Sequence, residues 1–215
     1  MTSSPPVVPT QADVSIWILA GGEGRRMNGQ DKGLLRHRGH ALVEWMLRAA
    51  EAWQMPVGIV ANRHADDYRT HLDRHIAPTR QLGVHPDDAD LPPRSGPMAG
   101  LLTATRHSTT PWLLILPCDT PMLPHELLPR LRAEAERAQA DVAVPITQPS
   151  AQESRPHWVC ALVRKGETPM IERAFVNGER KIGRWIQSRA WVGVCFARDA
   201  EFENINTLET LHDRD

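Results

Sequence analysis

The chain has 215 residues, of which 41% are hydrophobic, and 25 basic residues nearly balance 26 acidic ones. This balance excludes the strongly positive surface typical of proteins that bind DNA, RNA or anionic membranes. Three scattered cysteines without a C-x-x-C pair argue against a disulfide framework or a zinc site. No apolar run reaches membrane-spanning length, so a cytoplasmic protein is expected. Residues 1–13, rich in Ser and Pro, are expected to form a disordered leader before one domain at 14–215.

The first predicted element is a buried strand at 16–19 that runs into a glycine-rich loop. Glycine lets the backbone turn tightly and present N–H groups to a ligand, as in a phosphate cradle. Positions 23 to 40 carry five basic and two acidic residues, the local positive field that a polyphosphate site needs. The loop lacks the Gly-Lys-Ser/Thr end of a P-loop, and Met27 stands where the dinucleotide fingerprint needs a glycine. The alternative is a tight strand–helix turn with solvated arginines. The loop glycines are Gly21, Gly22 and Gly24.

Lys32 is the best single candidate for a triphosphate contact, because a compact ammonium on a flexible stem can follow phosphate oxygens as charge redistributes. A solvated surface lysine is the alternative. The next predicted elements are a short strand at 34–35, an amphipathic helix at 41–53 and a buried strand at 57–61. Asn62 falls at the carboxyl end of that strand, where open α/β sheets place ligand contacts; a turn residue is the alternative.

A polar helix is predicted at 64–75; its histidines lack the third ligand of a zinc site. The Pro-rich loop at 91–95 is a candidate flap over the site. A helix at 97–106 follows, and the small residues at its start permit close approach of a ligand or a neighbouring strand.

The stretch at 112–116 has no polar residue, as expected of a central parallel strand covered on both faces. It leads to Asp119, which is therefore placed at the carboxyl edge of the sheet, facing the same crevice as the glycine loop. Magnesium is commonly held by one or two carboxylates together with substrate phosphates and water. Asp119 is thus the predicted magnesium ligand, and a helix cap is the alternative.

The last third of the chain is predicted to supply the second-substrate region. A polar break separates a nucleotide-binding part at about 14–146 from this part at 147–215, within one sheet. Arg180 and Lys181 either meet an anionic substrate or start a helix in solvent. The predicted elements are a helix at 124–139, a strand at 141–145, the break at 147–156, a strand at 158–163, a helix opening at 178–181, and a strand at 191–196.

The string Leu19-Ala-Gly-Gly-x-x-x-Arg-Met27, followed by Asp31-Lys32-Gly33-Leu34, resembles the signature of the MobA family, the molybdenum cofactor guanylyltransferases. The resemblance implies a three-layer, Rossmann-like α/β nucleotidyltransferase fold with a mainly parallel central sheet. Further matches extend it over nearly the whole chain: Asn62-Arg63-His64, Gly96-Pro97-Met98-Ala99-Gly100, Pro117-Cys118-Asp119-Thr120-Pro121 and Asn204-Ile205-Asn206-Thr207.

The resemblance also implies roles for single residues. Arg26, Lys32 and Asp119 would neutralise charge during catalysis. Asp87 would contact the nucleotide, and a carboxylate can accept paired hydrogen bonds from guanine. The family carries an asparagine two positions before Asn62, so either Asn62 substitutes for it or the contact is lost. Residues implied to bind the nucleotide are Leu19, Ala20, Gly21, Gly22, Gly24, Lys32, Asn62, Asp87 and Asp119. Asn204 and Asn206 would hold the pterin or complete the metal shell, or else form a capping turn.

The implied activity is transfer of GMP from MgGTP to molybdopterin with release of pyrophosphate. Proteins that deliver the molybdenum cofactor or accept the product would be transient partners. No Ser-His-Asp or paired-carboxylate site is evident in the sequence, in keeping with a nucleophile that is already an anionic phosphate. Three alternatives are cytidylyl transfer to the same cofactor, a sugar-phosphate nucleotidyltransferase, and a non-catalytic nucleotide carrier or sensor.

Overall fold

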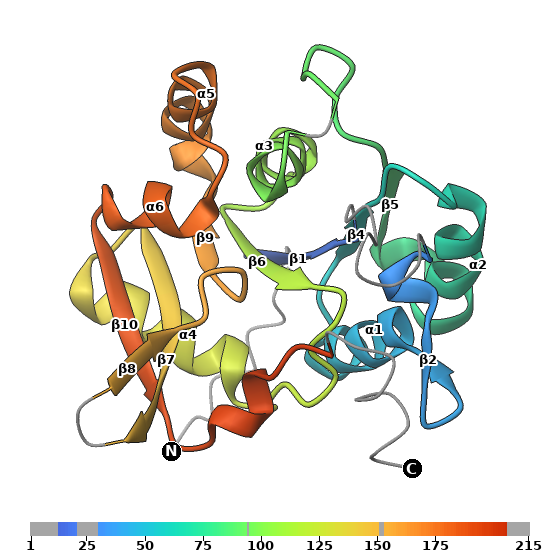
Figure 1. The fold of residues 1–215 in the computed structure, drawn as a ribbon, viewed down its shortest axis with the longest axis horizontal. Helices are drawn as coiled ribbons and strands as arrows, with labels where there is room; N and C mark the ends of the chain where they lie inside the picture. Colours follow the sequence, from blue (N-terminus) through green and yellow to red (C-terminus); the bar gives the residue numbers. More distant parts are fainter. Residues whose placement is uncertain (1–12, 21–29, 94, 151–152, 206–215) are drawn as a thin grey trace, which may run out of the picture.

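The computed structural model describes residues 13–20, 30–93, 95–150 and 153–205. Its centre is an eight-stranded sheet of order β10-β7-β9-β6-β1-β4-β5, with β8 paired to β7 outside this path (Figure 1). The strands are β1 (Val14–Leu19), β4 (Val57–Val60), β5 (Gln81–His85), β6 (Trp112–Pro117), β7 (Val142–Ser150), β8 (Glu153–Pro156), β9 (Leu162–Arg164) and β10 (Trp191–Phe196). Only β8 and β9 run antiparallel to their described partners, so the predicted mainly parallel sheet is confirmed.

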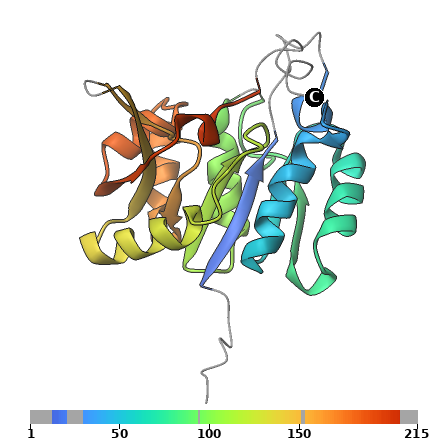
Figure 2. The same cartoon turned by 90° about the horizontal axis from the view of Figure 1, so that it is seen from below.

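Helices cover both faces of the sheet and complete the predicted three layers (Figure 1). Figure 2 shows α1 and α4 on the near side of the sheet, with strand β1 visible between them. On this face lie α1 (Leu42–Trp53), α2 (Ala65–His75) and α4 (Leu127–Ala138), which share one apolar core with the sheet. On the other lie α3 (Pro97–His107), α5 (Thr168–Val176) and α6 (Ile182–Gln187), which share a second core. Within the described ranges, no helix combines the length and apolar character needed to cross a bilayer.

The central strand β1 supplies both cores. Ile16 and Ile18 point into the core under α1, whereas Trp17 points into the core under α3, and all three are fully buried. Trp17 lies against Gly58 of the neighbouring strand, where a Cβ would overlap the indole ring. Because both faces are covered, the strand reads as an almost unbroken apolar run.

Several predicted elements are wrong in type or extent. Residues 34–35, predicted as a strand, belong to a 3-10 turn at Lys32–Leu34 and its end; the strand follows as β2 (Arg36–His37), paired with β3 (His40–Ala41). A two-residue turn, with positive φ at both Arg38 and Gly39, joins the two strands. Both strands are too short to show the alternating apolar pattern that predicts a strand.

The predicted polar break at 147–156 is instead a hairpin, because β7 continues to Ser150 and pairs antiparallel with β8. The outer part of this ribbon is exposed on both faces, so it lacks the apolar alternation that marks a strand. The next strand begins only at Leu162, because residues 158–160 form a turn closed by the Cys160 N–H bond to the His157 carbonyl. Helix α5 was not predicted, and α6 begins at Ile182 rather than at 178–181.

The carboxyl ends of β1 and β6 lie side by side. In the parallel register Leu19 is opposite Pro117, two residues before Asp119. Helix α3 approaches this edge closely at Gly100, where a Cβ would touch Leu19 and Val60. The predicted role of the small residues in allowing close approach is therefore confirmed for Gly100, and the predicted edge is formed.

Candidate active site

Lys32 and Asp119 form an ion pair at the carboxyl edge of the sheet, although 87 residues separate them in sequence. The Lys32 ammonium donates to Oδ2 of Asp119. Asp119 is buried, while a fifth of the Lys32 side chain remains exposed. The residue predicted to contact phosphate thus meets the residue predicted to hold metal.

The turn that carries Lys32 is built around Asp31, which is itself buried. Oδ1 of Asp31 accepts the backbone N–H of Gly33 at 3.2 Å and caps the 3-10 turn. The Asp31 carbonyl accepts the Leu34 N–H at 3.1 Å. These bonds fix the backbone on both sides of Lys32 and so direct its side chain.

The second carboxylate oxygen of Asp119, Oδ1, is buried and has no hydrogen-bond partner among the described residues. A buried oxygen with unused lone pairs suits a hard cation such as magnesium. Within the described ranges, no group of three or more His, Cys, Asp and Glu side chains could hold a metal. A cation at Asp119 would therefore take its other ligands from substrate phosphates and water, the usual pattern for magnesium.

Asn62 and Asp87 follow the neighbouring strands β4 and β5 and are joined by two hydrogen bonds. The Asn62 amide donates to Oδ2 of Asp87, and the Asp87 backbone N–H donates to Oδ1 of Asn62, each at 2.8 Å. Burial raises the pKa of Asp87 above its ordinary value, more than the bond from Asn62 lowers it. Val60, where the family carries its asparagine, is buried within β4.

The segment after Asp87 is anchored on α3. The Asp88 N–H donates to the Thr103 hydroxyl at 3.1 Å, and its carboxylate accepts bonds from Arg106 at 3.0 Å and His107 at 2.9 Å. Burial raises the pKa of Asp88, but the bonds from Arg106 and His107 outweigh it and hold the pKa below its ordinary value. The backbone directly after Asp87 is therefore held against α3.

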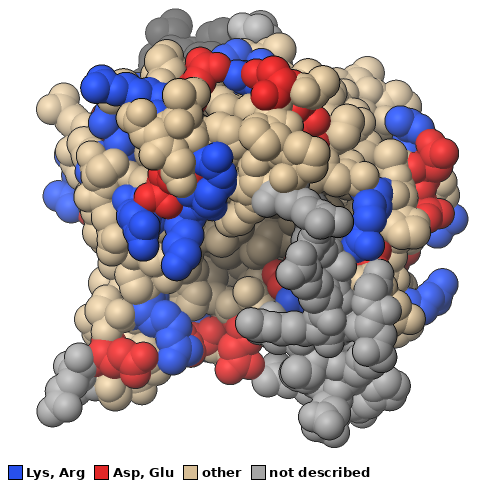
Figure 3. All heavy atoms as spheres, turned by 45° about the horizontal axis from the view of Figure 1, so that its top comes forward, with Lys and Arg blue, Asp and Glu red and all other residues tan. Residues whose placement is uncertain are grey.

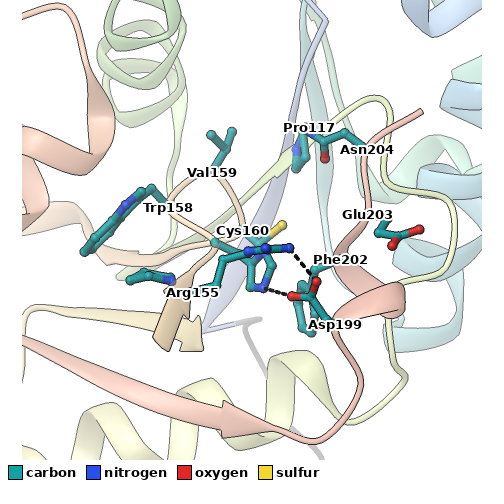
Figure 4. A pocket seen from close by; sticks show the side chains of 11 residues that line it. Pro117, Arg155, Trp158, Val159, Cys160, Asp199, Phe202, Glu203 and Asn204 are labelled. Atoms are coloured by element: carbon teal, nitrogen blue, oxygen red, sulfur yellow. Dashed lines mark hydrogen bonds and ion pairs between the residues drawn. The ribbon is translucent and has the colours of Figure 1, made fainter. Parts of the chain in front are cut away.

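A pocket of about 450 Å³ lies at the carboxyl edge of the sheet on the side of Asp119, here called the Asp119 edge (Figure 4). Asn204, one of the predicted pterin residues, lines it, and its side-chain oxygen accepts the Thr120 hydroxyl at 2.8 Å. The Ile205 N–H donates to the Asp119 carbonyl at 2.9 Å. The lining residues are Pro117, Arg155, Pro156, His157, Trp158, Val159, Cys160, Asp199, Phe202, Glu203 and Asn204.

One wall of this pocket is a polar network around Asp199. Its carboxylate accepts Arg155 at 2.5 Å and the Thr147 hydroxyl, and His157 lies 2.8 Å from the same hydroxyl oxygen. Burial lowers the pKa of His157, which favours the neutral ring as donor to Thr147. Phe202 stacks on His157 with 4.5 Å between ring centroids. The wall offers fixed polar groups on a rigid aromatic base.

The two predicted cations differ in their surroundings. Arg180 donates to the carbonyls of Phe175 and Glu179, at 2.7 and 2.9 Å, and stacks over the Phe175 ring, so it closes the end of α5. Lys181 is exposed, and its backbone N–H donates to Glu179. Figure 3 shows one face of the molecule, with a central hollow and Lys and Arg side chains gathered along part of its rim.

Two of the predicted nucleotide-binding residues lie at the carboxyl end of β1: Leu19 is its last residue, and Ala20 follows it. Leu19 is half-buried, and Ala20 is buried with its N–H bonded to the Val60 carbonyl at 2.8 Å. Five other predicted site residues lie outside the described residues: Gly21, Gly22, Gly24, Arg26 and Asn206.

Sequence reasoning missed Asp199 as a candidate site residue and Thr147 as its buried hydrogen-bond partner. Asp199 follows β10, and Thr147 continues β7, so both come from strands that point to the same edge as Asp119. Asp199 carries the same signal as Asp119, since it is an acid shortly after a predicted strand. Thr147 has no such signal, because the polar stretch at 147–156 predicts a break in the sheet.

The family model and the relatives that match this chain name the same protein family. A family model described as a MobA-like NTP transferase domain matches residues 16–193. A molybdenum cofactor guanylyltransferase from Acidovorax ebreus is 36% identical, covering 93% of this chain and 94% of that protein. One from Cupriavidus metallidurans is 34% identical, covering 93% of both.

Solved structures share the fold. Molybdopterin-guanine dinucleotide biosynthesis protein A from Archaeoglobus fulgidus superposes with a TM-score of 0.68 at 25% identity, covering 92% of this chain and 94% of that one. A 4-diphosphocytidyl-2C-methyl-D-erythritol synthase from Anaerococcus prevotii reaches a TM-score of 0.71 at 13% identity, covering 92% of both chains. The latter likeness concerns the fold alone.

Proposed function

The chain belongs to the MobA-like NTP transferase family, and from that premise we propose that it transfers GMP from GTP to the molybdopterin form of the molybdenum cofactor. An oxygen of the terminal phosphate of molybdopterin attacks the α-phosphorus of GTP. The bond from that phosphorus to the oxygen bridging to the β-phosphate breaks, and pyrophosphate leaves with the electron pair. The attacking phosphate is already an anion, so the reaction needs positioning and charge neutralisation rather than a strong base.

The observation that carries this proposal is the Lys32–Asp119 pair at the carboxyl edge of β1 and β6. Two anions must approach each other for this reaction, and a cation beside a carboxylate suited to metal meets that requirement. Arg26 and the loop glycines Gly21, Gly22 and Gly24 complete the phosphate site in this proposal.

We propose Asp119 as the protein ligand of magnesium. Its unpartnered Oδ1 fits a hard cation, and phosphates and water would supply the remaining oxygens. When bound, magnesium neutralises charge on the triphosphate and so supports departure of pyrophosphate. Lys32, bonded to the other oxygen, would hold the Asp119 carboxylate so that Oδ1 stays available to the ion.

Guanine selection falls to Asp87 in this proposal. A carboxylate accepts both the ring N–H and the amino group of guanine, a pair of donors that cytosine and adenine lack. Asn62 holds Asp87 by two hydrogen bonds. On this basis we propose that Asn62 takes over the role of the asparagine that the family carries where this chain has Val60. The rival cytidylyl transfer is not favoured by the relatives, which are named guanylyltransferases.

The pocket around Asp199 is the proposed pterin site, within the second-substrate part at 147–215. Its support is its position: Asn204 and Pro117 join it to the Asp119 edge, where the two substrates must meet. Polar groups fixed on the wall suit the amide and amino edges of a pterin. Lys181, and Asn206 in the adjoining segment, are the further proposed contacts, whereas Arg180 contributes through the backbone it closes.

One assay tests the proposal. The purified chain is given molybdopterin, magnesium and each nucleoside triphosphate in turn, and pyrophosphate is measured. We expect release with GTP. Turnover with CTP alone would reverse the base assignment, and nucleotide binding without any turnover would favour a carrier.

The cytoplasm is the proposed location of the protein, in keeping with its three free cysteines. Transient contact with proteins that deliver the cofactor and with proteins that accept the product is also proposed.

A further inference from the structure

Tyr68 has no role in the activity described above, yet it is fully buried. It lies next to the 3-10 turn that carries Lys32. It lies in α2, an otherwise polar helix whose buried side chains are Tyr68 and Leu72. Its hydroxyl donates to Oδ1 of Asp31, the oxygen that also accepts the Gly33 N–H. A side chain from a distant helix is therefore bonded to the cap of the Lys32 turn.

The fit around this hydroxyl is tight. At Gly33 a Cβ would clash with the Tyr68 hydroxyl and crowd its ring. Cys118, next to Asp119 in sequence, is buried in the same apolar core as Tyr68. Burial raises the pKa of Tyr68, so the hydroxyl stays protonated and remains a donor at any working pH. The tyrosine thus contacts the segment that carries Lys32 and lies near the one that carries Asp119.

We propose that Tyr68 is a positioning residue for guanylyl transfer: its hydroxyl fixes Asp31, and through Asp31 the turn from which Lys32 reaches Asp119. This inference rests on the proposed function. The alternative is a purely structural role, in which the hydroxyl only helps α2 to dock. The two differ because a positioning residue acts through Lys32, and a structural one does not.

The test is a double-mutant cycle of Tyr68→Phe and Lys32→Met on the full chain, with guanylyl transfer measured well below the unfolding temperature. Tyr68→Phe keeps the ring and removes only the hydroxyl. We expect it to lower kcat about tenfold with the KM for GTP within about twofold, since small misplacement of a charged group mainly costs transition-state stabilisation. In the Lys32→Met background the same change should alter kcat less than about twofold, because the group being positioned is gone.

Thr110→Val is the matched control. It also removes a buried hydroxyl, bonded to Ser15 and to the Trp112 carbonyl, at the opposite end of the sheet. We expect parent kcat from it. If Tyr68→Phe does not fold, Gly33→Ala provides a second route, since its methyl group pushes on the same hydroxyl and should lower kcat in the same way.

Two results would overturn the inference: full activity of Tyr68→Phe, or an equal loss of kcat in both backgrounds, which is additive behaviour. The unaltered chain is assayed in parallel. An inactive parent would count against the proposed function itself, whereas an active parent with an equally active Tyr68→Phe would count against the role of Tyr68 alone.

Discussion

Asn62 and Asp87 exchange two hydrogen bonds of 2.8 Å across the ends of adjacent strands, so each fixes the orientation of the other. The Asp87 carboxylate receives one bond from Asn62 on Oδ2 and keeps lone pairs for a ligand. Without its partner, the side chain of Asn62 or of Asp87 would not be held in one orientation. The pair instead forms a preorganised acceptor at the edge of the sheet.

Asp87→Asn should impair selection of guanine. The new amide places a donor where guanine also presents a donor, and we expect the KM for GTP to rise about 10- to 100-fold, the scale of one hydrogen bond to a charged group. Inosine triphosphate, which lacks the amino group, should lose less. Initial rates with both nucleotides measure this. Asp90→Asn, an acid of the same loop that pairs with Arg106, is the control. Equal losses for the two nucleotides would contradict the assignment.

The affinity for GTP should also depend on pH through Asp87. Burial raises the pKa of this carboxyl above its ordinary 3.8, so it takes up a proton at a higher pH than an exposed aspartate does. The protonated form accepts fewer hydrogen bonds, and the KM for GTP should therefore rise as the pH falls toward that raised pKa. The rise should be absent in Asp87→Asn. A profile unchanged by the substitution would show that another group is responsible.

Asp119→Asn should abolish turnover while leaving the fold intact. The amide keeps the size of the side chain but loses the charge that would hold magnesium and that pairs with Lys32. We expect kcat to fall at least about a thousandfold, comparable with the loss of a charge-stabilising group elsewhere. Chelation of divalent ions should stop the parent reversibly, with magnesium restoring it. An active Asp119→Asn, with an unchanged requirement for magnesium, would rule out the metal role.

Changes in the pocket wall should affect the second substrate and not the nucleotide. Arg155→Met leaves Asp199 without its exposed partner, and we expect the KM for molybdopterin to rise about tenfold with the KM for GTP unchanged. Arg137→Met, which removes a surface cation paired with Glu134 on α4, is the control. If the KM for GTP rises instead, the pocket belongs to the nucleotide.

Stability should fall in mildly acidic solution because of His75. Burial, with the charges of Arg48, His71 and Arg74, lowers the pKa of His75 below its ordinary 6.5, and Glu44 offsets this only in part. The unfolded chain then binds a proton that the folded chain does not, so the free energy of unfolding decreases as the pH falls below about 6.5. Urea unfolding at several pH values measures the slope, and His75→Gln should flatten it. A slope unaffected by that change would place its origin at another group.

The elements that could be predicted were those with a strong local signal. The run at 112–116 is apolar throughout because both of its faces are buried, and the helix at 41–53 carries its apolar residues at helical spacing because one face packs on the sheet. The hairpin β7–β8 had no such signal, since its outer residues face solvent on both sides. Its existence is decided by hydrogen bonds between strands.

The sequence by itself determined most of the strands and helices, because burial periodicity is a local property of the chain. Its resemblance to the MobA family implied the layered fold, and local motifs made Lys32 and Asp119 candidate site residues. Only the tertiary structure decided which side chains meet: Lys32 with Asp119, Asn62 with Asp87, and Tyr68 with Asp31. Such partners depend on strand order and on helix docking, which follow from packing of whole faces. No spacing along the chain encodes them.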